Sequence, residues 1–453
     1  MSGVFAGQAA VVVGFGESGR AAALALVEEG AEVRVTEARP AGELEPADAA
    51  GALGRVELLA GGHRPAHLDG ATLVVASPGV PESATVLRWA AHRKLPIWSE
   101  LELGARLCRV PFVAVTGTNG KTTTVELVAA AMRAGGLAAR ACGNVGYPFS
   151  TAAREPFDAL AVEASSFQLR FAETFHPRVS VLLNLAPDHL DWHETFDRYA
   201  EAKARVFAVQ GPGDTHVGNR DDAPAARVSA AAPCPVEWFR QGPPADGEVG
   251  VADGAIVARG RPGTNGPLTL GRPRSSASGF LADAAASASA SLAFGLPPDA
   301  VCEAVSTFSP LPHRGEVVAE VGGVRFLDDS KATNPHAALA ALDGLRDAVL
   351  VAGGLSKGVD LSPLAAAAPS LAGVVVLGEA AAEIAALFEP ALPVRKAGSI
   401  EEATKLALEL APEGGTVILA PACASQDMFH DYKERGDRFA AAALALATDD
   451  KGE

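Results

Sequence analysis

The sequence predicts an α/β protein of three domains, each organised around a largely parallel sheet. Its 453 residues correspond to about three domains of ordinary size. Apolar, β-branched runs alternate with helical patterns along nearly the whole chain, as in strand–helix–strand units. Glycine-containing loops follow strands in the first and second thirds of the chain. We place a Rossmann-like domain at residues 1–105, a central domain with a phosphate-binding loop at 106–309, and a second Rossmann-like domain at 310–453.

Composition and charge argue against several classes of protein. Hydrophobic residues make up 48% and charged residues 20% of the chain, which is a globular composition. A net charge of −16 argues against nonspecific binding to nucleic acid or to an anionic membrane. We see no apolar run near the ~18 residues of a membrane span, no signal peptide, and no C-x-x-C pair among the scattered cysteines. These features predict a reduced, cytoplasmic protein without disulfides or a zinc site.

A phosphate-binding loop is predicted within Phe112–Thr124, which reads FVAVTGTNGKTTT. An apolar strand runs into a small, polar loop that ends in Gly-Lys-Thr, and a helical pattern follows. Backbone N–H groups at such a helix start face anionic oxygens, while Lys121 can reach terminal phosphates and Thr122 can bind Mg²⁺. The spacing departs from G-x-x-x-x-G-K-[ST], because Val115 stands where the first glycine would and the loop begins at Gly117. The alternative is an ordinary strand-to-helix turn, which the adjacent Gly-Lys-Thr disfavours.

A glycine-rich turn also opens the first domain. A strand at Ala9–Val13 leads into GFGESG (14–19) and a helix at Arg20–Glu29, and a second strand at Glu32–Thr36 ends at Glu37. This is G-x-G-x-x-G in a β-α-β context, followed by an acidic residue about twenty positions on. A diphosphate can approach the helix start while the carboxylate accepts from a hydroxyl or N–H. The pattern therefore suits a UDP-sugar as well as NAD, and a turn without a ligand is the third alternative.

Further polar groups follow strands in the first and central domains. A strand at Leu73–Ala76 ends in Ser77-Pro78-Gly79, at the edge where ligands of open α/β sheets bind. A strand at Asp158–Val162 ends at Glu163, where a carboxylate is well placed to hold Mg²⁺. A strand at Arg178–Leu183 ends in NLAPDHLD (184–191). On pattern alone, His189 in this segment is about equally well explained as a functional residue and as an ordinary surface or core histidine.

The rest of the central domain carries fewer signals. On pattern alone Lys203, in a helix predicted at Phe196–Val209, is a solvated charge. A strand is predicted at Asp214–Gly218, and Gln241–Ser276 resembles a hairpin or a loop excursion. A long alanine- and serine-rich helix is expected at Phe280–Gly295.

The third domain repeats the pattern of strands that end in small, polar residues. Lys331 and Lys357 follow two of these strands, and two lysines at one sheet edge indicate an anionic ligand, although exposed loop lysines are common. The predicted strands are Val324–Leu327, Ala348–Ala352, Gly373–Leu377 and Thr416–Ala420.

Nearly the whole chain resembles the Mur ligase family of bacterial peptidoglycan synthesis. The motifs are TGTNGKTTT (116–124), GNVG (143–146), EASSFQL (163–169), NLAPDHLD (184–191), AKARVF (202–207), PHR (312–314), DDSKATN (328–334), GGLSKG (353–358) and PACASQDMF (421–429). The central motifs are shared by all Mur ligases and by folylpolyglutamate synthase. The compact GFGESG domain and the DSKATN and ACASxDxF segments are similar to the members that add D-glutamate.

The resemblance implies an ATP-dependent, amide-bond-forming ligase of the cytoplasm. ATP would phosphorylate the carboxylate of UDP-N-acetylmuramoyl-L-alanine, and the amine of D-glutamate would attack the acyl phosphate through a tetrahedral intermediate. The implied partners are these three small molecules, with no nucleic acid and no membrane, and we expect a monomer. Two Mg²⁺ ions are also implied.

The resemblance assigns roles to individual residues. It implies catalytic roles for Lys121, Glu163, His189 and Lys203. It implies an ATP site at Gly117, Thr118, Asn119, Gly120, Lys121, Thr122, Thr123, Asp283, Arg314 and Asp329. It implies a UDP-substrate site at Gly16, Glu17, Ser18, Glu37, Ser77, Pro78, Gly79, Asn144, Ser165, Gln168 and His189, and a D-glutamate site at Thr333, Lys357, Ser425 and Tyr432.

The metal ligands implied by the resemblance are Thr122 and Glu163 for one Mg²⁺, and Glu163, His189 and Lys203 for the other. A lysine ammonium cannot ligate a cation. In the family the matching lysine is carbamylated and so becomes an anionic oxygen donor, and only the resemblance supports this role for Lys203.

The chain departs from the family pattern at the start of the long alanine-rich helix. The family usually has His-Asn and a second Asn where this chain has Gly279-Phe280 and Asp283, and often Asp where it has Glu37. Phe280 can stack on a base but cannot make amide hydrogen bonds to its edge. The sequence therefore leaves open how adenine is held, and with it a strict preference for ATP.

Three alternatives to a D-glutamate-adding ligase stay open. The first is another ligase of the same family, either of the folylpolyglutamate synthase type, which the DSKATN and CAS segments disfavour, or L-glutamate-adding, which stays open because the sequence does not show chirality directly. The second is an NAD-dependent oxidoreductase, suggested by G-x-G-x-x-G but lacking a clear hydride-transfer site. The third is a nucleotide-binding module without catalysis.

Overall fold

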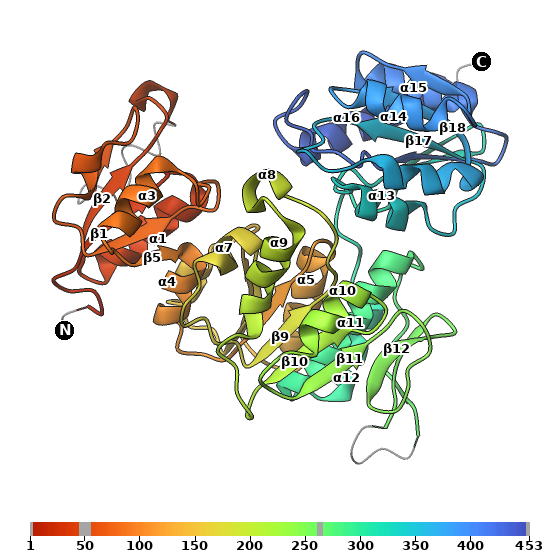
Figure 1. The fold of residues 1–453 in the computed structure, drawn as a ribbon. Coiled ribbons are helices and arrows are strands. Elements are labelled where there is room, and N and C mark those ends of the chain that lie inside the picture. Colours follow the sequence, from red (N-terminus) through yellow and green to blue (C-terminus); the bar gives the residue numbers. More distant parts are fainter. Residues whose placement is uncertain (1–2, 45–55, 261–265, 450–453) are drawn as a thin grey trace. The chain divides into compact units, whose positions relative to one another are not determined.

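A computed structural model describes residues 3–44, 56–260 and 266–449 of the chain (Figure 1). These residues form two compact units. The first unit contains two sheets and the second contains one. The first unit is made of Met1–Leu185, Asp197–Pro273 and Asp283–Phe308, and the second of Ala186–Phe196, Arg274–Ala282 and Ser309–Glu453. In the described part of the chain, no helix combines the length and the apolarity that crossing a membrane requires.

The first sheet consists of parallel strands in the order β3-β2-β1-β4-β5. The direction of winding reverses between β1 and β4, and ligands of such sheets bind at the carboxyl ends of the strands at this point. Its elements are β1 (Ala9–Val13), α1 (Glu17–Glu28), β2 (Glu32–Thr36), η1 (Ala41–Glu43), β3 (Val56–Leu59), η2 (Pro65–Leu68), β4 (Leu73–Ala76), α3 (Thr85–His92), β5 (Ile97–Ser99) and α4 (Glu100–Leu107).

The second sheet has the order β14-β13-β12-β11-β10-β9-β6-β8-β7 and is parallel from β7 to β12. The strands are β6 (Phe112–Thr116), β7 (Ala139–Gly143), β8 (Ala159–Glu163), β9 (Val179–Leu182), β10 (Thr215–Asn219), β11 (Val236–Phe239), β12 (Glu248–Ala252), β13 (Ala255–Ala258) and β14 (Leu268–Thr269). The helices along this stretch of chain are α5 (Lys121–Ala134), α6 (Phe149–Ala152), α7 (Ser166–Arg170), α8 (Leu190–His193), α9 (Phe196–Ala204), η3 (Arg205–Phe207), α10 (Ala223–Ser229), α11 (Ser278–Phe294) and α12 (Pro298–Thr307).

The third sheet has the order β15-β16-β20-β17-β18-β19 and is parallel except for the β15–β16 pair. Its elements are β15 (Glu316–Val321), β16 (Val324–Asp328), α13 (Pro335–Leu342), β17 (Ala348–Gly353), η4 (Ser362–Ser370), β18 (Leu371–Leu377), α14 (Ala381–Phe388), β19 (Val394–Lys396), α15 (Ile400–Leu410), β20 (Thr416–Leu419) and α16 (Tyr432–Asp449).

β6 shows how the central sheet places its loop. Every residue of Phe112–Thr116 is buried, as expected for a strand with both faces covered in a parallel sheet. Hydrogen bonds join β6 to β8 on one side and to β9 on the other. α5 packs back onto β6, β7 and β8. The loop between β6 and α5 is therefore held at the carboxyl edge of the sheet, in line with the ends of both neighbouring strands.

The predicted α/β class is confirmed, and most predicted strands lie within one or two residues of the observed ones. α1 begins at Glu17 rather than at Arg20, and the helix after Phe196 turns into a 3₁₀ segment at Arg205. The predicted excursion at Gln241–Ser276 is an antiparallel extension of the sheet by β13 and β14, apart from residues 261–265, which lie outside the described ranges. β3, β7, β11, β15 and β19 were not predicted. Of these, ARACG at β7 and VRK at β19 lack a clear apolar pattern.

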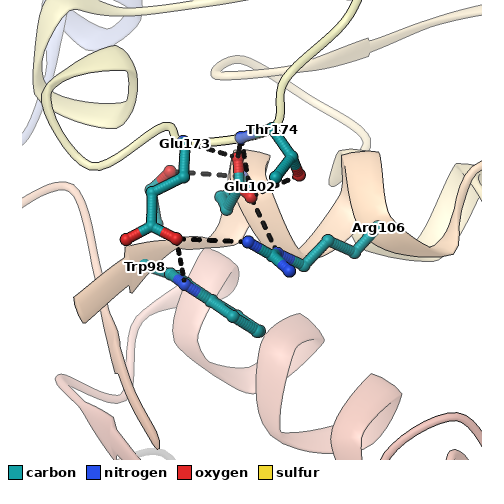
Figure 2. Close-up of polar contacts among 6 residues, drawn as sticks. Trp98, Glu102, Arg106, Glu173 and Thr174 are labelled. Atoms are coloured by element: carbon teal, nitrogen blue, oxygen red, sulfur yellow. Dashed lines mark hydrogen bonds and ion pairs between the residues drawn. The ribbon is translucent and has the colours of Figure 1, made fainter. Parts of the chain in front are cut away.

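A buried carboxylate anchors α4 to the segment between α7 and β9 (Figure 2). Glu102 is 0% exposed, and its carboxylate accepts hydrogen bonds from the backbone N–H groups of Glu173 at 2.9 Å and Thr174 at 3.0 Å. The Thr174 hydroxyl donates to it at 2.6 Å and Arg106 Nε at 2.7 Å. Arg106 also lies over the Trp98 ring, at 3.9 Å from its centroid. The side chain of Glu102 thus accepts the hydrogen bonds of the turn at Glu173 and Thr174, and it holds α4 against that turn.

We expect Glu102→Ala to lower the free energy of unfolding of the first unit by roughly 3 kcal/mol, because it leaves buried donors and the charge of Arg106 unpaired. Urea denaturation followed by circular dichroism measures the change. The control is Glu173→Ala, which removes an exposed partner of Arg106 and should cost less than about 1 kcal/mol. Equal midpoints for the two variants would contradict the anchoring role.

Candidate functional site

The predicted phosphate loop lies between β6 and α5. Gly120 precedes the first residue of α5 and has φ 85°, a conformation that favours glycine. A β-carbon at Gly120 would also come within 2.0 Å of Oδ1 of Asp283, so this carboxylate lies directly against the loop. The start of α5 carries the partial positive charge of the helix dipole. Asp283, predicted at the ATP site, is therefore brought to the phosphate loop.

Two lysine side chains converge on one carbonyl oxygen of the loop. Lys121 Nζ donates to the Gly117 carbonyl at 2.8 Å and to the Thr118 carbonyl at 2.8 Å. Lys203 Nζ, from α9, donates to the same Gly117 carbonyl at 2.7 Å. Lys203 is only 2% exposed, so the interpretation of Lys203 as a solvated charge is wrong. Its helix places it inside the site that the Gly-Lys-Thr loop defines.

Glu163 connects the loop to the ends of two other strands. Its Oε2 accepts from the Thr122 hydroxyl at 2.7 Å, and its Oε1 accepts from Asn144 Nδ2 at 3.0 Å. Glu163 closes β8 and is 2% exposed. The structure thus brings together three residues that the sequence analysis placed in the metal and substrate sites.

Two residues of this site were missed in the sequence. Asn184 accepts from the backbone N–H of Asn119 at 2.8 Å and donates to the Asn119 carbonyl at 3.2 Å. The Tyr199 hydroxyl shares a hydrogen bond with the Thr118 hydroxyl at 3.0 Å. Both side chains fix the loop backbone. Asn184 was recognisable as the first polar residue after a strand, whereas Tyr199 gave no signal beyond its place in the helix of Lys203.

Two of the predicted metal ligands, Thr122 and Glu163, offer neighbouring oxygen atoms of the kind that Mg²⁺ binds. Among the residues that the structure describes, no three His, Cys, Asp or Glu side chains form a cluster that could hold a metal ion by themselves. Mg²⁺ commonly takes one or two protein ligands and completes its shell with water and phosphate oxygens. The adjacent Thr122 hydroxyl and Glu163 carboxylate match this requirement.

Side-chain hydrogen bonds stabilise the glycine turn of the first sheet. Gly14 has φ 89°, and the Ser77 hydroxyl donates to its carbonyl at 3.1 Å. The Glu37 carboxylate accepts from the N–H of Phe15 at 2.7 Å and from the N–H of Arg39 at 2.9 Å. Burial opposes ionisation of Glu37, but these hydrogen bonds and the Arg39 guanidinium outweigh it and lower the pKa of Glu37.

The remaining residues of this predicted site surround that turn. Glu17 and Ser18 begin α1, directly after Gly16, while Pro78 and Gly79 form the turn after β4. Since β1 and β4 are neighbours, the two loops lie at the point where the sheet reverses its winding.

Ser165 and Gln168 form a capping box at the start of α7. Gln168 Oε1 accepts from the Ser165 N–H at 3.1 Å, and because a backbone N–H can only donate, the atom facing it must be the oxygen. Gln168 is 0% exposed, and its Nε2 has no hydrogen-bond partner among the described residues. An unpaired buried amide is costly, which marks this side chain as a candidate for ligand contact.

In the second unit, two loops carry the predicted D-glutamate residues. Leu355 and Ala424 form an antiparallel bridge that joins the loop of Lys357 to the loop of Ser425. Ser425 is 1% exposed, and its hydroxyl has no partner within the described ranges. Thr333 precedes α13 and Tyr432 begins α16.

Arg435 ties these segments together and was not predicted. It is 1% exposed. Its guanidinium donates to the Ser330 hydroxyl at 3.0 Å, to the Ser330 carbonyl at 2.8 Å and to the Cys423 carbonyl at 3.1 Å. The Ser330 hydroxyl in turn donates to the Tyr432 carbonyl at 2.7 Å. One buried cation therefore connects the DDSKATN segment, the ACAS segment and α16.

Four further predicted residues belong to the second unit. His189 precedes α8 and has φ 54°, and its Nε2 lies 3.7 Å from Oδ2 of Asp188. Phe280 lies in the part of α11 that belongs to this unit. Arg314 attracts the carboxylate of Asp329 electrostatically. Their roles in binding ATP, UDP-substrate or metal stay predictions.

We expect the stability of the chain to depend on pH through Asp329. Burial raises the pKa of Asp329 to about 7 from 3.8, although Arg314 opposes the shift. A folded-state pKa above the unfolded value means that the folded state binds more protons. The stabilising contribution is then complete below about pH 4 and is lost as the pH rises through about 7.

Thermal unfolding of the chain and of Asp329→Asn, at about pH 5 and about pH 8, tests this. The variant should gain stability relative to the unmodified chain at the higher pH. A difference that does not change with pH would contradict the assignment.

Comparisons with known proteins agree along the length of the chain. The Mur ligase MurD-like N-terminal domain matches residues 8–99, the Mur ligase middle domain matches 115–242, and the Mur ligase glutamate ligase domain matches 313–423. The chain is 44% identical over 460 residues to UDP-N-acetylmuramoylalanine--D-glutamate ligase of Frankia casuarinae, covering 97% of this chain and 95% of that protein. It is 41% identical over 453 residues to the protein of the same name from Pelotomaculum thermopropionicum, covering 96% of this chain and 97% of that protein.

Solved structures show the same fold at low sequence identity. A pseudomurein peptide ligase type C from Methanothermus fervidus has a TM-score of 0.61 at 19% identity, covering 97% of this chain and 99% of that one. The MurF ligase from Thermotoga maritima in complex with ADP has a TM-score of 0.61 at 16% identity, covering 98% and 96%. Since three Mur ligase domains match in order and the relatives align almost end to end, the chain belongs to the Mur ligase family, in its group of UDP-N-acetylmuramoylalanine--D-glutamate ligases.

Proposed function

We propose that the chain joins D-glutamate to UDP-N-acetylmuramoyl-L-alanine in peptidoglycan precursor synthesis, with conversion of ATP to ADP and phosphate. The observation that carries this proposal is 44% identity over 97% of the chain to a relative of that name. The phosphate loop supports it, because its backbone, lysine and hydroxyl groups are those that a phosphoryl-transfer site requires. We further propose a cytoplasmic monomer.

The proposed reaction has two steps, phosphoryl transfer and amide formation. The alanyl carboxylate attacks the γ-phosphorus of ATP, the bond to the β-phosphate oxygen breaks, and ADP leaves. The D-glutamate nitrogen then adds to the carbonyl carbon of the acyl phosphate and gives a tetrahedral intermediate. Collapse expels phosphate and forms the amide, and the amine loses a proton. Both steps bring anions together, so the site must supply positive charge.

Lys121 is suited to supply that charge. Its ammonium group is fixed by the carbonyls of Gly117 and Thr118, over the loop that would surround the phosphates. Thr122 and Glu163 would hold a Mg²⁺ ion, which when bound neutralises phosphate oxygens. The chain's own contribution is to keep these groups in place before the substrates arrive, since Asn144 holds Glu163 and Asn184 holds the loop.

We propose that Lys203 works as a carbamate. In the unmodified protein, the Lys203 and Lys121 ammonium groups donate to one carbonyl oxygen, so two like charges lie close together, and one of them, Lys203, is buried. A carbamate on Lys203 retains an N–H that can donate to Gly117 and replaces the positive charge with a negative one. This change relieves the repulsion and supplies oxygen atoms for a second Mg²⁺, with Glu163 and His189.

Substrate contacts are proposed where buried polar atoms lack protein partners. Gln168 Nε2 supports a contact to the muramoyl-alanine part, and the Ser425 hydroxyl supports a contact to D-glutamate. Lys357, on the loop bridged to that of Ser425, would pair with a glutamate carboxylate. The remaining predicted contacts to UDP and ATP belong to the same proposal.

Among the alternatives, an L-glutamate-adding ligase of the same family is the nearest. The likeness to a solved structure of E. coli FolC in complex with DHPP and ADP, at 18% identity, concerns the fold alone. Family membership removes the oxidoreductase interpretation of the glycine turn, so that the turn is better explained by the diphosphate of a UDP-sugar.

We expect product with D-glutamate and at least 100-fold less with L-glutamate, because the amine and both carboxylates must be placed together and the enantiomer cannot match all three. The assay supplies UDP-N-acetylmuramoyl-L-alanine, ATP and Mg²⁺ and measures phosphate release and product mass. Product with L-glutamate instead would change the assignment of the amino-acid pocket. Phosphate release with neither amino acid would overturn the proposed function.

We expect Lys203→Ala to lose nearly all ligase activity, with partial recovery when short carboxylic acids such as acetate or formate are added. The exogenous carboxylate would replace the carbamate oxygens that the variant lacks. Lys405→Ala, which removes an exposed lysine on α15, is the matched control and should keep full activity without any response to acids. Full activity of Lys203→Ala would remove this lysine from the mechanism.

A further inference from the structure

A cavity lies at the amino edge of the central sheet, away from the phosphate loop. It has a volume of about 540 Å³ and is lined by the connection from α4 to β6 and by the segments that lead into β9 and β10. The phosphate loop follows the carboxyl end of β6, whereas this cavity borders Phe112, the first residue of that strand. The two places therefore lie at opposite ends of β6, and none of the predicted substrate residues lines the cavity.

Two arginine side chains line this cavity. Within the described part of the chain, neither Arg109 nor Arg178 lies within ion-pair distance of a carboxylate. The acidic residue of the cavity, Asp214, is already engaged, since it accepts from His176 Nε2 at 2.7 Å and from the Gly211 N–H at 2.8 Å. Both side chains are exposed, and the Arg178 guanidinium carbon lies 5.4 Å from the centroid of the Phe294 ring. Two guanidinium groups that line one hollow without an ion pair to any described residue are accessible to an anionic ligand.

The surroundings favour an occupant larger than a single ion. Small-molecule sites commonly have volumes of about 300–1,000 Å³ and combine apolar walls with a few polar groups. Val110 and Pro111 supply an apolar wall beside Arg109. Guanidinium groups bind phosphate oxygens in pairs of parallel hydrogen bonds. We propose that this cavity is a binding site for a small organic phosphate, with its phosphate between Arg109 and Arg178 and its organic part against Val110 and Pro111.

The site is joined to the anchor of α4. Thr174 lines the cavity and also donates its hydroxyl to Glu102, while Arg109 follows the end of the same helix. An occupant held by Arg109 and Arg178 therefore links α4 to the start of β9 a second time. Binding at this site should raise the thermal midpoint of the chain independently of the ligase site.

Isothermal titration calorimetry tests the site with two probes, inorganic pyrophosphate and uridine 5′-monophosphate. The full chain is first saturated with ADP, Mg²⁺ and UDP, so that both nucleotide sites of the proposed ligase are filled. We expect the unmodified chain to bind one further probe molecule. In Arg109→Gln/Arg178→Gln this binding should weaken at least tenfold, and the accompanying rise in thermal midpoint should disappear.

Arg227→Gln is the matched control, because it removes an exposed arginine from α10 of the same unit and should bind like the unmodified chain. Tighter binding of the nucleotide than of pyrophosphate supports an organic phosphate. Binding of pyrophosphate but not of the nucleotide would contradict the proposal of an organic phosphate and would indicate a site for an inorganic anion. Equal binding by the double variant, or no extra site in the unmodified chain, would overturn the proposal, and neither result bears on ligation.

Discussion

The central site depends on one backbone carbonyl that receives two lysine ammonium groups. Gly117 accepts from Lys121 of the loop's own helix and from Lys203 of a helix much later in the chain. This contact orders the loop and brings two ammonium groups to one oxygen atom, beside the carboxylate of Asp283. Like charges held close together repel each other most strongly where little water screens them. The proposed binding of phosphates and the proposed carbamate on Lys203 would each bring negative charge to this place.

Strand order determines which groups can reach that loop. β6 lies between β8 and β9 in the sheet, although α5, β7 and α6 separate it from β8 in the chain. Glu163 at the end of β8 therefore meets Thr122, and Asn184 after β9 meets Asn119. Each contact joins residues distant in sequence but adjacent at one sheet edge. A parallel sheet thus assembles a polar site from short polar segments, each of which follows a separate apolar strand.

The sequence predicted the parts of the site that a local pattern defines, and missed those that only packing creates. Gly120-Lys121-Thr122 and Glu163 were predicted because a loop or a carboxylate directly follows a strand. The burial of Lys203 could not be predicted, because its neighbours Glu201 and Arg205 suggest a solvated face. The buried roles of Glu102 and Arg435 likewise depend on partners tens of residues away. The short strand VRK at β19 is defined by its pairing with β18, which its own three residues do not reveal.

Two kinds of buried polar group can be contrasted in this chain, those with several hydrogen bonds inside the protein and those with none to any described residue. Glu102 and Arg435 are buried with several hydrogen bonds each, and so contribute to the fold. Gln168 Nε2 and the Ser425 hydroxyl are buried without any partner among the described residues, at a cost that selection for stability alone would remove. Both are residues that the family resemblance places against substrate. Other buried atoms, among them the Ser289 and Ser291 hydroxyls, also have no partner among the described residues, so it is the coincidence with the family's substrate positions that supports a ligand contact at Gln168 and Ser425.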